Sequence, residues 1–291
     1  MVNIVVGVLM FKSPSFGGSY LSLMNIADYY EVRSTEGTYF RLGTPITGPE
    51  ATAEMVILLA PLILFYTIVK KQYWCSILLL VALQALMQTA TRSGVLLTGL
   101  NIIFLLFAFN IYLKDVKLKF INLAIPFTVI AYLGTNPEIL QTIFYRFTEI
   151  SSGSNSSFAE QLNRGTVWNN ALLAISNSMI IGHGFTRYTE GDYTNFHSLY
   201  LTTVFQFGLL LGLILIFGLF YLLVQLFKTY KFNRISINEK ILALTLFLSF
   251  GAFLVNEFKY EFNRFPSYML LIYLYFYICI ETVKGNKCPK Q

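Results

Sequence analysis

The chain has 291 residues, of which 55% are hydrophobic and only 12% are charged. Soluble domains average about 25% charged residues, so this composition excludes an ordinary soluble protein and predicts a polytopic membrane protein. The charges that make up the net charge of +6 are therefore assigned to the two sides of a membrane, and the net charge does not indicate nucleic-acid binding.

Seven charge-free apolar segments predict membrane-spanning helices: 55–69, 73–91, 93–113, 120–135, 199–227, 241–256 and 267–280. Roughly 17–25 helical residues cross a hydrocarbon core, and a helix satisfies its own backbone polar groups there. Met1–Phe11 is apolar but too short to span alone, so we expect the rest of another span or an interfacial segment. The sequence thus predicts an all-α bundle of seven or eight spans, forming one integral membrane domain over 1–291.

The basic residues divide between the two sides of the predicted membrane. Eleven lysines and one arginine fall on one side, contributed by Lys70, Lys71, the loops 114–119 and 228–240, and the tail after Glu281. The other side receives seven arginines and two lysines. Because short basic loops face the cytoplasm, we expect the lysine-rich side to be cytoplasmic, which makes 12–50 and 136–198 external loops.

The larger external loop, 136–198, contains a predicted amphipathic helix. Trp168, Ala171, Leu172 and Ile175 recur at the spacing of one helix face, and Arg164 lies one turn before Trp168. We expect this helix to lie over the membrane domain on that face. The following apolar run, 199–227, is longer than a span requires, so its first residues should project from the bilayer or the helix should tilt.

Polar and charged residues gather at the predicted outer boundary of the membrane. They are Arg41, Arg92, Arg164, His197, Glu257 and Glu261. Arginine captures phosphate and carboxylate through two parallel hydrogen bonds, and positive-inside counting gives no reason for arginine to replace lysine outside. Such a boundary suits a substrate with a lipid tail and a charged, water-soluble head.

A purely structural role stays open for each of these residues. Arg92 could be an arginine that snorkels from a helix end, and the outer arginines could pair with outer acids such as Glu138 or Glu149. His197 could be a polar residue that ends a span. The predicted spans carry no charge, which argues against a proton-coupled transporter. His183 and His197 have no acidic partners at a zinc-site spacing, and the three cysteines show no metal or redox spacing, so we expect no metal and no cofactor.

Four stretches, in this order, resemble the O-antigen ligase and O-antigen polymerase superfamily of bacterial membrane glycosyltransferases. Arg41-Leu42-Gly43-Thr44 with Pro49 resembles its RxxGT-Pro segment, and Thr91-Arg92-Ser93-Gly94 resembles its turn between two spans. Arg164 with Trp168, and Gly182 with Gly184, resemble motifs of the family's large external loop. His197 resembles the histidine that opens the family's next span, and Gly208 and Gly212 resemble the glycines of that span. The family usually has Asn in place of Ser198 and ten or more spans, so we expect amino-terminal spans to be missing here.

The resemblance implies a glycosyltransferase that polymerises undecaprenyl-diphosphate-linked oligosaccharide repeat units of capsule, exopolysaccharide or O-antigen. It would act at the outer face of the bacterial cytoplasmic membrane, amid membrane lipid, beside a chain-length regulator and a flippase, without metal or nucleotide sugar. Arg92, Arg164 and Arg41 would bind the diphosphate, and His197 would act as catalytic base or orient the acceptor hydroxyl. The alternatives are an O-antigen ligase that transfers glycan to lipid A-core, and a non-enzymatic lipid-linked glycan transporter component.

Overall fold

A computed structural model describes residues 4–5, 8–9, 31–34, 37–40, 49–89, 91–113, 155–184, 196, 198–232, 235–259 and 266–285. Within these residues the chain forms a short hairpin followed by seven helices. The elements are β1 (Glu31–Ser34), β2 (Gly37–Phe40), α3 (Pro49–Ile68), α4 (Cys75–Gln88), α5 (Arg92–Tyr112), α8 (Asn155–Asn177), α9 (Leu199–Lys231), α10 (Ile237–Asn256) and α11 (Pro266–Gly285).

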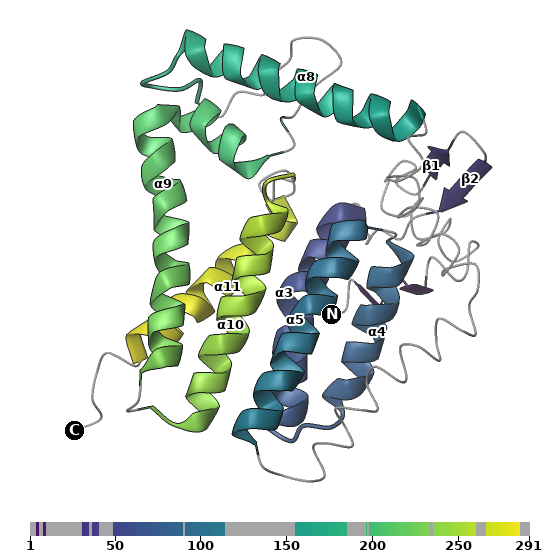
Figure 1. Cartoon of the computed structure of the whole chain (residues 1–291), viewed down its shortest axis with the longest axis vertical. Helices are drawn as coiled ribbons and strands as arrows, with labels where there is room; N and C mark the ends of the chain where they lie inside the picture. Colours follow the sequence, from purple (N-terminus) through teal and green to yellow (C-terminus); the bar gives the residue numbers. More distant parts are fainter. Residues whose placement is uncertain are drawn as a thin grey trace.

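Six of the helices form one bundle, and α8 lies across one end of it (Figure 1). α3 is at the centre, where it packs against α4, α5 and α10, while α10 also packs against α5 and α9. Phe65, Phe250, Phe253 and Tyr268 are fully buried large side chains of the core between these helices. Ile4 and Val8, from the apolar amino-terminal segment, belong to the same core.

Five of the described helices are long and apolar enough to cross a membrane, namely α3, α5, α9, α10 and α11. This confirms the all-helical, membrane-spanning class. α4 has 14 residues and rises only about 21 Å, which is short of a hydrocarbon core. It is shorter than the predicted 73–91 because Tyr73 and Trp74 lie in the turn before it. The predicted span 120–135 lies outside the described residues, so the predicted number of spans stays a prediction.

The hairpin was not predicted from the sequence. β1 and β2 pair antiparallel, with Glu31 opposite Phe40 and Ser34 opposite Gly37. The alternation of Val32 with polar neighbours and the run Thr38-Tyr39-Phe40 are typical of strands, but they lie in a segment that we expected only to be an external loop. The pair immediately precedes Arg41.

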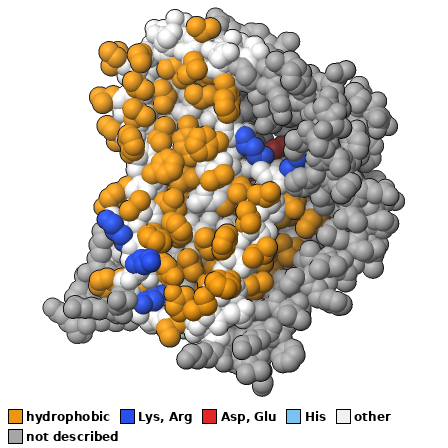
Figure 2. All heavy atoms as spheres, in the orientation of Figure 1, with side chains coloured by type: hydrophobic (Ala, Val, Ile, Leu, Met, Phe, Trp, Pro, Cys, Tyr) orange, Lys and Arg blue, Asp and Glu red, His pale blue; other side chains and the backbone are white. Residues whose placement is uncertain are grey.

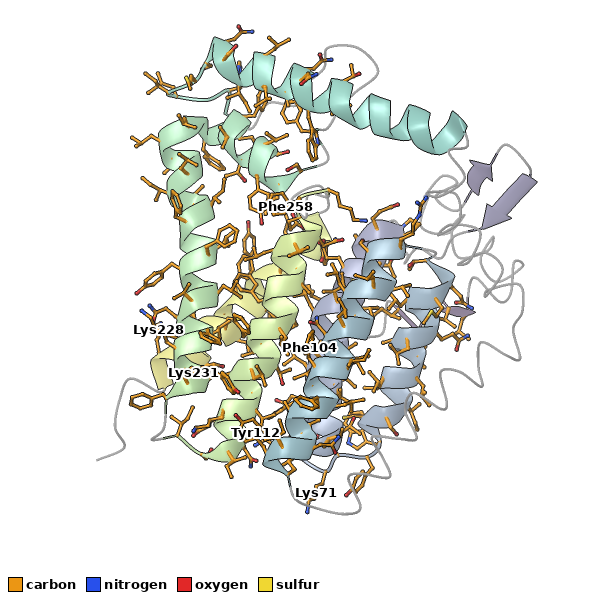
Figure 3. All side chains as sticks on the ribbon, in the orientation of Figure 1. Lys71, Phe104, Tyr112, Lys228, Lys231 and Phe258 are labelled. Atoms are coloured by element: carbon orange, nitrogen blue, oxygen red, sulfur yellow. The ribbon has the colours of Figure 1, made fainter. Side chains whose placement is uncertain are left out.

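The described lysines and arginine separate along the bundle as the charge pattern predicts. Lys70 and Lys71 follow the carboxyl end of α3, and Lys228 and Lys231 lie in the last turn of α9. Figure 3 shows Lys71, Lys228 and Lys231 toward the end of the bundle that lies away from α8. Arg92 begins α5 and Lys259 follows α10, at the α8 end. Between the two ends, the face in Figure 2 is mostly hydrophobic, as lipid contact requires.

Candidate functional site

Arg92 is held at the α8 end of the bundle by a tight turn between α4 and α5. Thr89 and Thr91 are buried, the Thr89 hydroxyl donates to the Leu86 carbonyl at 2.7 Å, and the Thr91 amide donates to the Thr89 hydroxyl at 3.3 Å. These bonds satisfy polar groups that the turn would otherwise bury without partners. Arg92 itself is half-buried and is the first residue of α5.

Gly94 explains how closely this turn approaches α3. A Cβ atom at Gly94 would lie 2.8 Å from the Ala53 Cβ and 3.1 Å from the Leu86 Cδ1. Only a residue without a side chain lets the first turn of α5 pack so tightly against α3 and α4. The Thr-Arg-Ser-Gly stretch therefore positions an arginine on a rigid, packed turn.

A buried carboxyl group lies beside this turn, and the sequence analysis missed it. α3 begins at Pro49, six residues before the predicted span, because proline is well suited to a first helical position. The helix therefore includes Glu50 and Glu54, and Glu54 is fully buried. The prediction that every span is free of charge is wrong for α3, since Glu54 was the residue just before the apolar run 55–69.

Glu54 is the centre of a hydrogen-bonded network that joins α3, α5, α10 and α11. Its Oε1 accepts from the Asn256 Nδ2 at 2.6 Å, and its Oε2 accepts from the Tyr268 hydroxyl at 3.0 Å. The Asn256 Oδ1 in turn accepts from the Ser93 hydroxyl at 2.9 Å. We call Glu54, Ser93, Asn256 and Tyr268 the Glu54 network.

Two further charged groups belong to the surroundings of this network. Glu257, the buried residue that caps the carboxyl end of α10, interacts with the Glu54 side chain, and Lys259 attracts the Glu54 charge. Figure 2 shows basic and acidic side chains together in one recess of the face that it draws, separated by hydrophobic side chains from the basic side chains toward the other end.

The chain that follows His197 is attached to the same place. The Leu199 amide donates to the Glu257 carbonyl at 3.0 Å, and the Tyr200 hydroxyl donates to the Leu254 carbonyl at 2.8 Å. The Tyr200 ring also lies 4.5 Å, centroid to centroid, from Phe258, which Figure 3 shows at the end of α10 below α8. His197 lies outside the described residues, and its neighbours Phe196 and Ser198 are both buried.

α9 is broken at Gly208, which agrees with the expectation that its first residues project from the bilayer rather than with a single tilted helix. Gly208 has φ 74° and ψ 171°, a conformation that favours glycine, and it divides a first segment, 199–207, from the rest of the helix, which ends at Lys231. In Figure 1 the first segment lies under α8, and the chain then turns to run along the bundle. His197 therefore precedes a short helical segment at the bundle end, and the span itself begins after Gly208.

The break is occupied by the turn that follows α8. The His183 amide donates to the Phe205 carbonyl, the Gly184 amide to the Gln206 carbonyl and the Leu209 amide to the Met179 carbonyl, at 2.8, 2.9 and 2.7 Å. The backbones approach so closely that a Cβ at Gly208 would lie 2.0 Å from the Ile180 oxygen, and one at Gly182 would lie 2.3 Å from the Gly208 nitrogen. The glycines singled out by the sequence thus join α8 to α9.

His183 belongs to this junction and has a packing role. Its ring stacks on Phe205 at 4.4 Å between centroids, and its Nε2 lies 2.9 Å from the Ala174 carbonyl oxygen. Among the described residues, no three His, Cys, Asp or Glu side chains are grouped as a metal site would need. The expectation that the protein needs no metal stays a prediction.

α8 packs on α9 through a face that coincides only in part with the predicted one. Val167, Ala171, Ala174 and Ile175 are buried against Phe196 and Phe205. Ala171 and Ile175 were predicted correctly, but Trp168 is 39% and Leu172 is 56% exposed. Ala171 and Ala174 allow α8 to approach the short first segment of α9 closely, whereas Trp168 and Leu172 lie at the more exposed side of the helix.

The structure brings Arg92 and the start of α9 to one end of the bundle, next to the Glu54 network. Arg164 lies in α8, which covers that end, and its side chain is not among those described. Arg41 follows β2 and lies outside the described residues. Whether the three arginines and His197 converge on one substrate stays a prediction.

Comparison with known proteins supports the resemblance. Residues 77–217 match the family described as O-Antigen ligase, Wzy_C. The matched region contains Arg92, Arg164 and His197, whereas Arg41, Glu54 and Asn256 lie outside it. No curated protein and no solved structure matches the chain.

Proposed function

Because residues 77–217 form an O-antigen ligase family domain in a protein with five helices fit to cross a membrane, we propose that the protein is a membrane glycosyltransferase that polymerises lipid-linked oligosaccharide repeat units. The family involves ligation or polymerisation of O-antigen and related polysaccharides, and it implies lipid-linked glycan substrates. The finer proposal is a donor carried on undecaprenyl diphosphate, used at the outer face of the cytoplasmic membrane.

Arg92 is the observation that carries the proposal. It is a half-buried guanidinium at the amino end of a membrane helix, on a turn made rigid by Thr89, Thr91 and Gly94. The amino end of a helix favours anions, and arginine adds two parallel hydrogen bonds to a phosphate. A donor with a long isoprenoid tail and a diphosphate head would bring its charge to this depth of the membrane.

The reaction breaks the bond between the sugar C1 and the diphosphate oxygen and forms a bond from C1 to an acceptor hydroxyl oxygen. The leaving lipid diphosphate carries the bonding electron pair, and Arg92, Arg164 and Arg41 stabilise its growing charge. His197 takes the hydroxyl proton or orients that hydroxyl, a contribution typically worth about 10²–10⁴-fold in rate. The leaving group is already stable as an anion, so these residues can account for the chemistry.

Incubating the purified protein in lipid nanodiscs with undecaprenyl-diphosphate-linked repeat units tests the proposal. A ladder of products that differ by one repeat unit supports polymerisation, and release of undecaprenyl diphosphate should match each bond formed. Transfer to added lipid A-core, without a ladder, would favour the ligase alternative. In sealed vesicles, movement of the donor between leaflets without any new linkage would favour the transporter alternative and refute the enzyme.

A further inference from the structure

Glu54 is the feature that the proposed function leaves unused. It is a carboxyl group with 0% exposure, on the helix at the centre of a membrane bundle. Removing a charged or polar group from water is costly unless it is fully hydrogen-bonded, and ionisable residues in membrane helices therefore usually serve function. Both Glu54 oxygens are satisfied, by Asn256 and Tyr268.

The partners of Glu54 lie at the points where the site is assembled. Ser93, which donates to Asn256, is the residue next to Arg92 in the first turn of α5. Asn256 is the last residue of α10, and the adjoining Glu257 carbonyl holds the Leu199 amide at the start of α9. A single buried carboxyl group thus connects the turn that carries Arg92 with the end of α10 that anchors the chain after His197.

Burial excludes direct contact between Glu54 and a water-soluble head group, so its effect has to pass through other residues. We propose that Glu54 is a positioning residue that, through Asn256 and Ser93, sets the place of Arg92 relative to the start of α9. This inference rests on the proposed function, in which Arg92 binds a lipid diphosphate. It adds residues of α3 and α10 that lie outside the matched family region.

The chemistry of the network explains why a carboxyl group is used. Glu54 accepts hydrogen bonds at both oxygens, which leaves the Asn256 amide oriented with its oxygen toward Ser93. A glutamine at this position has one acceptor oxygen and one amide NH2 group, so it cannot accept hydrogen bonds from both Asn256 and Tyr268 as the carboxyl group does. The resulting rearrangement of Asn256 would loosen the Ser93 hydroxyl and the turn beside it.

The test measures binding of undecaprenyl diphosphate to the full chain in nanodiscs. Glu54→Gln should weaken binding about 10- to 100-fold, and Ser93→Ala, which removes one hydrogen bond, about tenfold. In the Arg92→Ala background both substitutions should have no further effect, because the residue they position is absent. In the polymerisation assay the same variants should raise the donor KM more than they lower kcat.

Two control variants match the chemical changes at places away from the network. Glu281→Gln removes the same charge from an exposed pair with Lys284 at the other end of the bundle. Thr245→Val removes a buried hydroxyl that donates to the Ile241 carbonyl of its own helix. Both controls should bind undecaprenyl diphosphate as the unmodified protein does.

The outcomes separate positioning from simple support of the fold. Equal losses of undecaprenyl diphosphate binding with and without Arg92 would show a general packing role and overturn the proposal. Unchanged binding in Ser93→Ala would also overturn it. The Ser93→Ala result decides the test if Glu54→Gln does not fold. Unchanged binding in Arg92→Ala would also overturn it. If binding depends on Arg92 and Glu54 but no glycan is transferred by the unmodified protein, the positioning stands and the proposed function fails.

Discussion

Replacing Gly208 by alanine should detach α8 from α9. Gly208 has φ 74° and ψ 171°, a conformation that costs a residue with a side chain about 1–3 kcal/mol. The new Cβ would also lie 2.0 Å from the Ile180 oxygen and 2.9 Å from the Gly182 nitrogen. Both are backbone atoms, so the turn after α8 has to move away from the break in α9.

The size of the effect follows from the bonds at this junction. Three backbone hydrogen bonds connect 179–184 with 205–209, each worth about 1 kcal/mol net. Their loss together with the backbone penalty lowers the local opening free energy by roughly 4–6 kcal/mol. Hydrogen exchange of the His183, Gly184 and Leu209 amides should then accelerate about 10³-fold.

Two other glycines separate the causes. Gly184 has φ 68° but nothing within 4 Å of an added Cβ, so Gly184→Ala should show only the conformational cost. Gly218 lies in the membrane-crossing part of α9 with open space around it, and Gly218→Ala should leave exchange at the junction unchanged. Glycan transfer should fall in the order of the exchange rates, because α8 carries Arg164. Equal protection in Gly208→Ala and Gly218→Ala would refute the reasoning.

Three further predictions concern the site, the fold and the orientation. Arg92→Ala should abolish long polymer while the protein still inserts in the membrane, and Arg92→Lys should restore little, because lysine lacks the two-pronged donor; normal chain lengths on a gel would contradict the diphosphate role. Ser236→Ala removes a capping box from α10 and should lower stability by about 1 kcal/mol, seen as a lower melting temperature with unchanged specific activity. A cysteine at Lys70 should resist a membrane-impermeant maleimide added to intact cells, whereas one at Ile181, which is 83% exposed, should react; the reverse pattern would invert the proposed orientation.

The membrane class and the helix positions were predictable because they depend on local composition. A helix that crosses lipid needs a run of apolar residues, and such a run is visible without knowing its neighbours. Four of the predicted spans overlap α3, α5, α10 and α11 along most of their length, and Lys70, Lys71, Lys228 and Lys231 lie toward one end of the bundle. The missed hairpin has only short strands, whose signal is weak in a segment without strong alternation.

The site was predictable only in part. Arg92 stood out because two apolar runs meet there with almost no loop, and the structure confirms a short, packed turn. Glu54 did not stand out, because it precedes an apolar run and reads as the polar edge of a helix. Its partners Asn256 and Tyr268 lie more than 200 residues later in the chain, and no local pattern joins residues at that separation.

The sequence by itself determined that this is a membrane protein, that its residues 77–217 match the O-antigen ligase family, and that an arginine lies where two apolar runs meet with almost no loop. Tertiary structure alone decided that α9 breaks at Gly208, that Val167 and Ala174 join the predicted residues of α8 in the contact, and that a buried carboxyl group joins the helix ends around Arg92. The physical reason is range. Hydrophobicity and charge act on each segment separately, whereas close backbone approach and buried hydrogen bonds exist only once distant segments have packed together.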